Sequence, residues 1–221
     1  MSIKGEYTVM AIPNAQTYEW LLKKHYAHRI PSISYAYGLY DKDNILQGVC
    51  SFGTPASSTL LSGICGGNHA DKVLELNRLV VNDICPHNSA SFFVSRCLKL
   101  LPAPKIIVSY ADSGQGHIGY VYQACNFIYT GLSSKFLDPK VKGLEHQHHA
   151  TYGYGLTNAQ LKEKFGDKLY FVERDRKHRY IYFVGCYELK SELKYPILPY
   201  PKGDNKRYDA SYKPQVQGVL L

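Results

Sequence analysis

No apolar run in this sequence approaches the roughly 20 residues that a membrane-spanning helix needs. The first residues also lack the pattern of a secretory signal. The six cysteines include no Cys-x-x-Cys pair and mostly lie inside apolar runs, which argues against a zinc site and against a disulfide framework. We therefore expect a soluble, cytoplasmic protein, monomeric or homodimeric, with reduced and buried thiols.

Acidic residues are scarce relative to basic ones: 18 stand against 26, which gives a formal net charge of +8. The chain also contains 20 tyrosines in 221 residues. Positive charge combined with rings that can stack on bases favours a nucleic-acid partner. A basic protein without such a partner is the alternative.

Hydrophobic periodicity predicts alternating strands and helices in a single domain over residues 1–194. Strands are expected at 7–12, 73–81, 105–110 and 126–129, a hairpin at 33–40 and 45–52, helices at 14–26 and 88–101, and a loop at 53–68. Residues 132–168 are polar and histidine-rich and are interpreted as an insertion. A second hairpin is predicted from 169–173 and 180–186, and the basic Tyr/Pro-rich tail 195–221 is expected to be extended or disordered.

The segment 109–131, SYADSGQGHIGYVYQACNFIYTG, combines the end of a strand, an acidic turn and a tyrosine-bearing helix. Asp112 or Ser113 can cap the next helix, and Gly114 and Gly116 let other groups approach the turn closely. The pattern is compatible with an active site and equally with a strand–helix–strand unit that has no catalytic role.

Strand alternation places Arg78 on the same face as Leu74, Leu76 and Val80. An arginine among aliphatic side chains is costly unless it is paired or used. One interpretation is an ion pair with Asp112 at the end of the neighbouring strand. In the other, Arg78 orients a carbonyl, a phosphate or a base.

Polar residues also mark the ends of two predicted helices. Asn88, Ser89 and Ser91 begin the helix 88–101, where N–H groups and hydroxyls can bind phosphate or simply cap the helix. His25 and Tyr26 follow the first helix and suit base stacking, proton transfer or metal ligation, unless they form a solvated helix end.

The order strand, polar turn, helix ending in Tyr-x-x-x-Asn-Phe, then strand resembles the second half of the GNAT acyltransferase fold. Together with 75–81 (ELNRLVV) and 88–101 (NSASFFVSRCLKLL), the 109–131 block resembles the Mom family of phage DNA adenine-modification proteins over roughly residues 15–135. The resemblance implies an α/β (α+β) fold with a mixed, mainly antiparallel sheet flanked by helices. In place of the glycine-rich pyrophosphate loop of GNAT enzymes, this chain carries PHNSAS at 86–91.

The resemblance also implies an activity: conversion of adenine in DNA to an N6-carbamoylmethyl derivative, which protects phage DNA from host restriction. Tyr122 would protonate the leaving group, Asp112 would act as base or orient N6, and Arg78 would hold the donor. His25 and Tyr26 would lie on the acceptor side. The residues expected to contact the donor are Asn88, Ser89, Ser91, Gly114, Gly116 and His117.

Two donors are compatible with this product. Acetyl-CoA would require activation of its methyl C–H bond and a source of nitrogen, which implies a redox metal such as iron; His25, Tyr26, Asp112 and His117 are the candidate ligands. Alternatively, a glycyl group from glycyl-tRNA is transferred to N6, after which its amine attacks C6 and the original nitrogen departs as the amide. That route needs no metal.

In either route the target base must leave a double-stranded DNA helix. Tyr110 can stack on it, and a basic turn can bind phosphates through Arg174, Arg176, Lys177 and Arg179, although a charged turn is often only solvated. Two alternatives remain: a GNAT acetyltransferase that acts on a protein or small amine and binds coenzyme A, and a non-catalytic DNA-binding protein.

Overall fold

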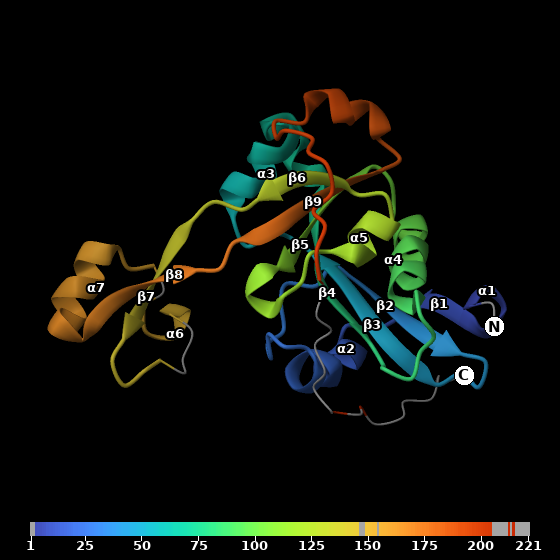
Figure 1. The fold of residues 1–221 in the computed structure, drawn as a ribbon, viewed down its shortest axis with the longest axis horizontal. Coiled ribbons are helices and arrows are strands. Elements are labelled where there is room, and N and C mark those ends of the chain that lie inside the picture. The colour runs from blue at the N-terminus through green and yellow to red at the C-terminus, as the bar shows by residue number, and fades with distance from the viewer. Residues whose placement is uncertain (1–2, 146–148, 154, 205–211, 213, 215–221) are drawn as a thin grey trace.

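A computed structural model describes residues 3–145, 149–153, 155–204, 212 and 214 (Figure 1). The strands are β1 (Tyr7–Ala11), β2 (Tyr35–Asp41), β3 (Leu46–Gly53), β4 (Val73–Val81), β5 (Lys105–Asp112), β6 (Ile128–Leu132), β7 (Phe136–Val141), β8 (Leu169–Arg174) and β9 (Lys177–Val184). The α-helices are α1 (Ile3–Glu6), α2 (Ala15–Glu19), α3 (Ser58–Cys65), α4 (Ser89–Leu100), α5 (Tyr120–Ala124), α6 (His149–Gly153) and α7 (Asn158–Phe165).

The main sheet has seven strands in the order β1-β2-β3-β4-β5-β9-β6. Only β4 and β5 run parallel, and the other neighbouring strands are antiparallel. This arrangement confirms the predicted mixed, mainly antiparallel sheet flanked by helices. It also confirms the hairpin of β2 and β3.

Three apolar clusters cover the two faces of the sheet. Helix α4 places Phe93, Val94, Cys97 and Leu98 at helical spacing against one face, and α5 extends the same layer. On the opposite face, α3 packs at one end of the sheet, and α2 with the π-helical turn Trp20–Lys24 packs at the other. All six cysteines are free and buried, as predicted.

The predicted loop 53–68 is wrong, because half of it, Ser58–Cys65, forms α3. Leu60, Leu61, Ile64 and Cys65 recur at helical spacing, and Ile64 and Cys65 are buried in the core. The surrounding Gly, Ser and Thr residues concealed this short amphipathic stripe.

The predicted second hairpin, 169–173 with 180–186, is also wrong. β9 instead lies between β5 and β6, whereas β8 pairs with β7 in a separate two-stranded sheet. The physical reason is burial: Tyr180, Ile181 and Phe183 of β9 fill the main core, whereas β8 is largely exposed.

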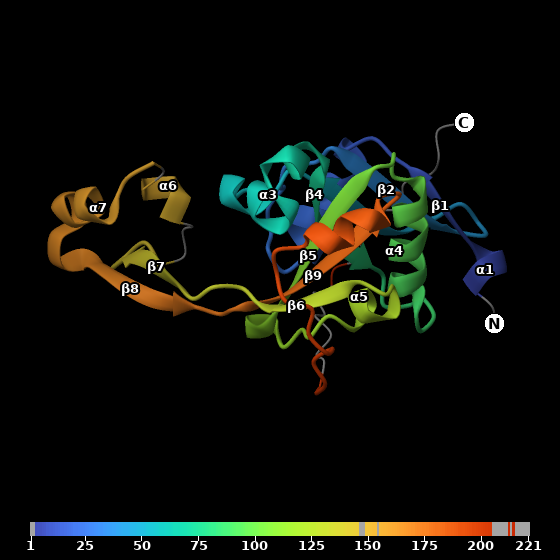
Figure 2. The ribbon, with the colours of Figure 1, turned by 90° about the horizontal axis from the view of Figure 1, so that it is seen from above.

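The two-stranded sheet, α6 and α7 form an arm that projects from the body of the molecule (Figures 1 and 2). Residues 146–148 and 154 of the predicted insertion lie outside the described residues. Within the described part of the chain, none of the helices combines the length and apolar character needed to cross a bilayer.

The beginning of the predicted tail is extended and lies along β6. The N–H of Leu198 donates to the carbonyl of Tyr129 at 3.0 Å, and the Tyr200 hydroxyl donates to the carbonyl of Phe127 at 2.7 Å. Residues 205–211, 213 and 215–221 of that tail are not among those described.

Candidate active site

A cavity of about 570 Å³ opens where β4 and β5 separate. The two strands pair only from Val73 with Ile106 to Leu76 with Ser109. Beyond that point β4 continues to Val81 beside β3, and β5 continues to Asp112 beside β9. Since the two strands are no longer paired there, side chains from both faces of the sheet meet in the gap.

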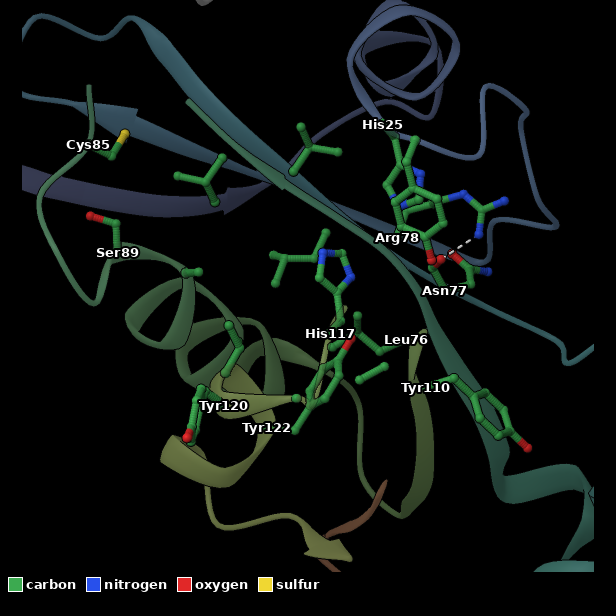
Figure 3. A pocket seen from close by; sticks show the side chains of 18 of the residues that line it. His25, Leu76, Asn77, Arg78, Cys85, Ser89, Tyr110, His117, Tyr120 and Tyr122 are labelled. Carbon is green, nitrogen blue, oxygen red and sulfur yellow. Dashed lines mark hydrogen bonds between the residues drawn. The ribbon is translucent and has the colours of Figure 1, made fainter. Parts of the chain in front are cut away.

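The cavity brings together many of the residues predicted from the sequence (Figure 3). The predicted residues that line it are His25, Tyr26, Arg78, Asn88, Ser89, Tyr110, His117, Tyr122 and Lys177. The predicted residues outside its lining are Ser91, Asp112, Gly114, Gly116, Arg174, Arg176 and Arg179.

An aromatic stack forms one wall. The rings of His25 and Tyr26 stack with centroids 4.4 Å apart, and His117 meets Tyr26 edge-on at 5.8 Å. Burial raises the pKa of Tyr26 to about 12. Burial also lowers the pKa of His25 to about 3, with the charge of Arg78 as the next cause. The wall is therefore uncharged at neutral pH and suits a planar, uncharged group.

The tautomer of His25 follows from its contacts. Its Nδ1 lies 3.0 Å from the backbone N–H of Ala27, which donates to it. Because Nδ1 must offer a lone pair to that donor, the single proton of the neutral ring is on Nε2. His25 thus presents a hydrogen-bond donor and not a proton-accepting nitrogen.

Arg78 lies in the same half of the cavity, with its guanidinium only partly satisfied. The residue is 9% exposed, and its Nη1 donates to the carbonyl of Asn77 at 2.6 Å. Its buried Nε and Nη2 have no hydrogen-bond partner among the described residues. Burial lowers its pKa. The buried cation therefore lines the cavity with three of its N–H groups, on Nε and Nη2, unpaired and shielded from solvent.

The predicted ion pair between Arg78 and Asp112 is not formed. Asp112 instead binds Nζ of Lys177 through Oδ2 at 2.8 Å and accepts the N–H of Gly114 through Oδ1 at 3.1 Å. It caps a single 3-10 turn, Ser113–Gln115. Gly114 faces Asp175, where an added Cβ would lie 2.3 Å from Oδ2. Asp112 in this turn thus holds Lys177 at the cavity. The glycines of the turn allow its close packing and do not contact the cavity.

Glu75 is a cavity residue that sequence analysis missed. It is largely buried on β4, and burial raises its pKa against the opposing charges of Arg78, Lys177 and Arg29. Its charge in turn contributes to the raised pKa values of Tyr26, Tyr110 and Tyr122. A carboxylate with a raised pKa among aromatic rings in a cavity is a candidate proton acceptor.

The other half of the cavity lies under α4 and α5. Tyr122 packs against Phe127 and Tyr180, with centroids 5.4 and 5.3 Å away, and burial raises the pKa of its hydroxyl. The hydroxyl is therefore protonated at neutral pH and suits an acid. Asn88 adopts a left-handed conformation with no side-chain cap, and Ser89 Oγ donates to the carbonyl of Pro86 at 2.7 Å.

Three predicted phosphate-binding arginines are engaged within the protein. Arg174 pairs with Asp138 at 2.7 Å, Arg176 donates to the carbonyls of Ser133 and Leu132, and Arg179 donates to Thr130 and stacks on Tyr195. The Arg176 contacts lie at the junction between the body and the arm. Of the predicted basic turn, only Lys177 reaches the cavity.

The candidate iron ligands do not fit a metal. Nδ1 of His25 is taken by the Ala27 N–H, and the Asp112 carboxylate is held by Lys177 and Gly114. Across the described part of the chain, His, Cys, Asp and Glu form no group of three or more that could hold an ion.

Comparison with known proteins identifies relatives along most of the chain. The model of the Mom protein family matches residues 6–202. The methylcarbamoylase mom of Escherichia phage Mu is 28% identical over 189 residues, which cover 81% of this chain and 77% of that protein.

Similar solved structures belong to acetyltransferases. A GNAT-family acetyltransferase from Bacillus cereus has a TM-score of 0.43 and 11% identity, covering 80% of this chain and 96% of that one. A mutant spermidine N-acetyltransferase from Vibrio cholerae has a TM-score of 0.45 and 9% identity, covering 85% and 99%.

Proposed function

Because the chain belongs to the Mom protein family, we propose that it is a transferase that converts adenine in DNA to N6-carbamoylmethyladenine. The supporting observation is the cavity between β4 and β5, where an uncharged aromatic wall faces a protonated tyrosine. The phage Mu relative, named a methylcarbamoylase, supports the same product. The net charge of +8 suits a polyanionic substrate.

The acceptor base enters the half of the cavity that contains His25 and Tyr26. Once flipped out of the duplex, adenine stacks against these uncharged rings, and its N6 faces Glu75. Glu75 takes the proton that N6 loses as the new bond forms. This assignment replaces Asp112, whose carboxylate is engaged with Lys177, and gives Asp112 the role of positioning that lysine.

The acyl donor occupies the half under α4 and α5. Ser89 and Ala90, in the first turn of α4, line this half; the N–H of Ser89 donates to the carbonyl of Pro86, and the N–H of Ala90 can bind a donor phosphate. Tyr122 supplies a proton to the departing oxygen or sulfur. A transfer RNA and coenzyme A both carry phosphates that this end could bind.

A glycyl donor accounts for the product without a redox step. N6 attacks the glycyl carbonyl, and the ester C–O bond breaks as Tyr122 protonates the 3′-oxygen. The glycyl amine then attacks C6 through a five-membered ring, and the C6–N6 bond breaks with transfer of a proton to the departing nitrogen. The result is C6–NH–CH2–CO–NH2, with both carbons, the oxygen and the nitrogen of the glycyl group retained.

Labelled donors test this proposal. Purified protein is incubated with DNA and either glycyl-tRNA carrying 13C and 15N in its glycyl group or 13C-acetyl-CoA, and the DNA is digested to nucleosides for mass spectrometry. We expect both glycine carbons in modified deoxyadenosine and the glycine nitrogen attached to C6. Label from acetyl-CoA as an N-acetyl group, or no modified deoxyadenosine with either donor, would contradict the proposal.

The role of Tyr122 is tested by Tyr122→Phe. Loss of a general acid should lower product formation by about 10²- to 10⁴-fold, while the urea unfolding midpoint stays close to that of the wild type because the ring is retained. Tyr187→Phe, at a tyrosine that is 65% exposed on the surface, is the matched control and should retain full activity. Equal activities of the two variants would remove Tyr122 from the mechanism.

A further inference from the structure

An irregularity in β4 brings Glu75 and Arg78 to the same face of the sheet. Residues three apart in a regular strand point to opposite faces. Here Arg78 pairs with Ser51 and Leu76 pairs with Phe52, so Asn77 is an extra residue in a β-bulge. The apolar clusters confirm the switch, since Leu76 and Leu79 lie on the α4 face whereas Val80 lies on the α2 face. The prediction of a single face shared by Leu74, Leu76, Arg78 and Val80 is therefore wrong.

The bulge is held in place by the side chain of Asn77. Its Oδ1 accepts a hydrogen bond from Ser51 Oγ at 2.7 Å, and its Nδ2 donates to the carbonyl of Ser32 at 2.8 Å. Each end of the amide has a partner within the protein. Asn77 therefore fixes the orientation of its neighbours.

Glu75 and Arg78 share this face without forming an ion pair in the described structure. Each influences the charge of the other, yet two nitrogens of Arg78, Nε and Nη2, remain buried and unpaired among the described residues. An unpaired buried donor is unfavourable until a ligand supplies an acceptor. Glu75 and Arg78 thus line the cavity on one face of the sheet beside the His25–Tyr26 stack, and a turn of the Arg78 side chain would bring its unpaired donors to a ligand.

We propose that Glu75 and Arg78 read the edge of the flipped base. Glu75 accepts a hydrogen bond from the 6-amino group, and Arg78 donates to a ring nitrogen beside it, N7 or N1. This inference rests on the proposed function, because it takes adenine as the acceptor. With this arrangement the site would select adenine, because guanine and hypoxanthine place O6 where Glu75 needs a donor, so two acceptors would face each other.

Binding to unpaired bases tests the inference without any acyl donor. The probe is a fluorescent DNA duplex with a single bulged base, because a bulged base costs less to extrude. The bulged base is adenine, hypoxanthine, 7-deazaadenine or 1-deazaadenine, and affinities are measured by anisotropy at fixed salt. We expect the full-length protein to bind adenine between about 5- and 100-fold more tightly than hypoxanthine, and to lose affinity for one of the two deaza bases.

Two variants identify the residues responsible. Glu75→Gln exchanges the acceptor for an amide that can donate to O6, so binding of hypoxanthine should become tighter relative to adenine. Partial misfolding would weaken binding of both bases and would not by itself change their ratio. The Arg78→Met variant should bind the deaza base and adenine with equal affinity, because the donor to the ring nitrogen is gone. Matched controls are Glu188→Gln and Arg96→Met, both on the exposed surface, which should keep the wild-type preferences.

The outcomes separate this inference from the proposed function. An unchanged adenine-to-hypoxanthine ratio in Glu75→Gln, or an undiminished deaza effect in Arg78→Met, overturns the base-reading role. Neither result bears on whether the protein modifies DNA, which the labelled-donor experiment measures by product. A wild-type protein that modifies deoxyadenosine yet binds adenine and hypoxanthine equally would overturn this inference alone.

Discussion

At the residue scale, burial keeps the imidazole of His25 neutral at acidic pH values where a free histidine is protonated. The ring is 8% exposed and its pKa is lowered to about 3 from 6.5, first by burial and then by the charge of Arg78. An unfolded chain binds a proton near pH 6.5, so between about pH 6.5 and pH 3 the unfolded state carries the extra proton. Folding stability therefore falls as the pH drops through this window.

His25→Asn tests this linkage, because the Asn oxygen can replace Nδ1 as acceptor for Ala27 while removing the titration. We expect the wild type to lose about 1–2 kcal/mol more than the variant in free energy of unfolding between pH 7 and pH 5. Urea unfolding at several pH values measures it. His117 and His178, whose pKa values burial also lowers, contribute equally to both proteins and cancel. If both proteins lose the same free energy of unfolding between pH 7 and pH 5, folding does not lower the pKa of His25.

Residue identity alone revealed part of the candidate site. Arg78 could be found because an arginine is unexpected in an aliphatic strand, and His25, Tyr26 and Tyr122 because they follow or occupy predicted helices. Glu75 could not, since a one-residue bulge reverses the face to which it points and leaves no mark in hydrophobic periodicity. The partner of Asp112 was hidden for a different reason: Lys177 reaches it only through the pairing of β5 with β9.

At the element scale, the bulged junction of β3 and β4 depends on a close backbone approach. Gly53 pairs with Glu75, and a Cβ added to Gly53 would lie 1.9 Å from the carbonyl oxygen of Ser32. That oxygen is also held by Asn77. Since the clash is with backbone, side-chain rotation cannot relieve it.

Gly53→Ala should therefore lower the free energy of unfolding by about 1–3 kcal/mol. Gly67→Ala is the matched control, because nothing lies within 4 Å of its added Cβ, and it should stay within about 0.5 kcal/mol of the wild type. Urea denaturation of the three proteins compares them. If both substitutions cost the same, the Ser32 contact does not constrain this strand pair.

Prediction of elements succeeded where the signal was local and failed where partners had to be chosen at long range. β2, β3, β4, α4 and β5 were each indicated by their own periodicity. The wrong hairpin joined two segments that are close in sequence, whereas β9 is buried in the main sheet and β8 pairs with β7. Only the packed core distinguishes these alternatives, because both segments are β-rich and flank the same basic turn.

At the scale of the whole molecule, the arm carries little of the net positive charge and the body carries most of it. Residues 136–174 contain six Lys or Arg and five Asp or Glu, so their removal leaves +7 of the net charge of +8. The arm also has a small core of its own, in which Val141, Tyr152 and Leu161 are buried. Its two ends meet, since Phe136 pairs with Arg174 and Lys135 binds Glu173 at 3.3 Å.

Replacing 136–174 with a short glycine linker should consequently leave the body folded. The linker closes a smaller loop than the arm does, which changes the free energy of unfolding by only about 1 kcal/mol. DNA affinity and its dependence on salt should also persist, because that slope depends on the number of phosphates neutralised and nearly all the positive charge remains. Urea unfolding and anisotropy titrations across a salt series measure both. A folded excision variant with a much shallower salt slope would instead place the principal DNA contacts on the arm.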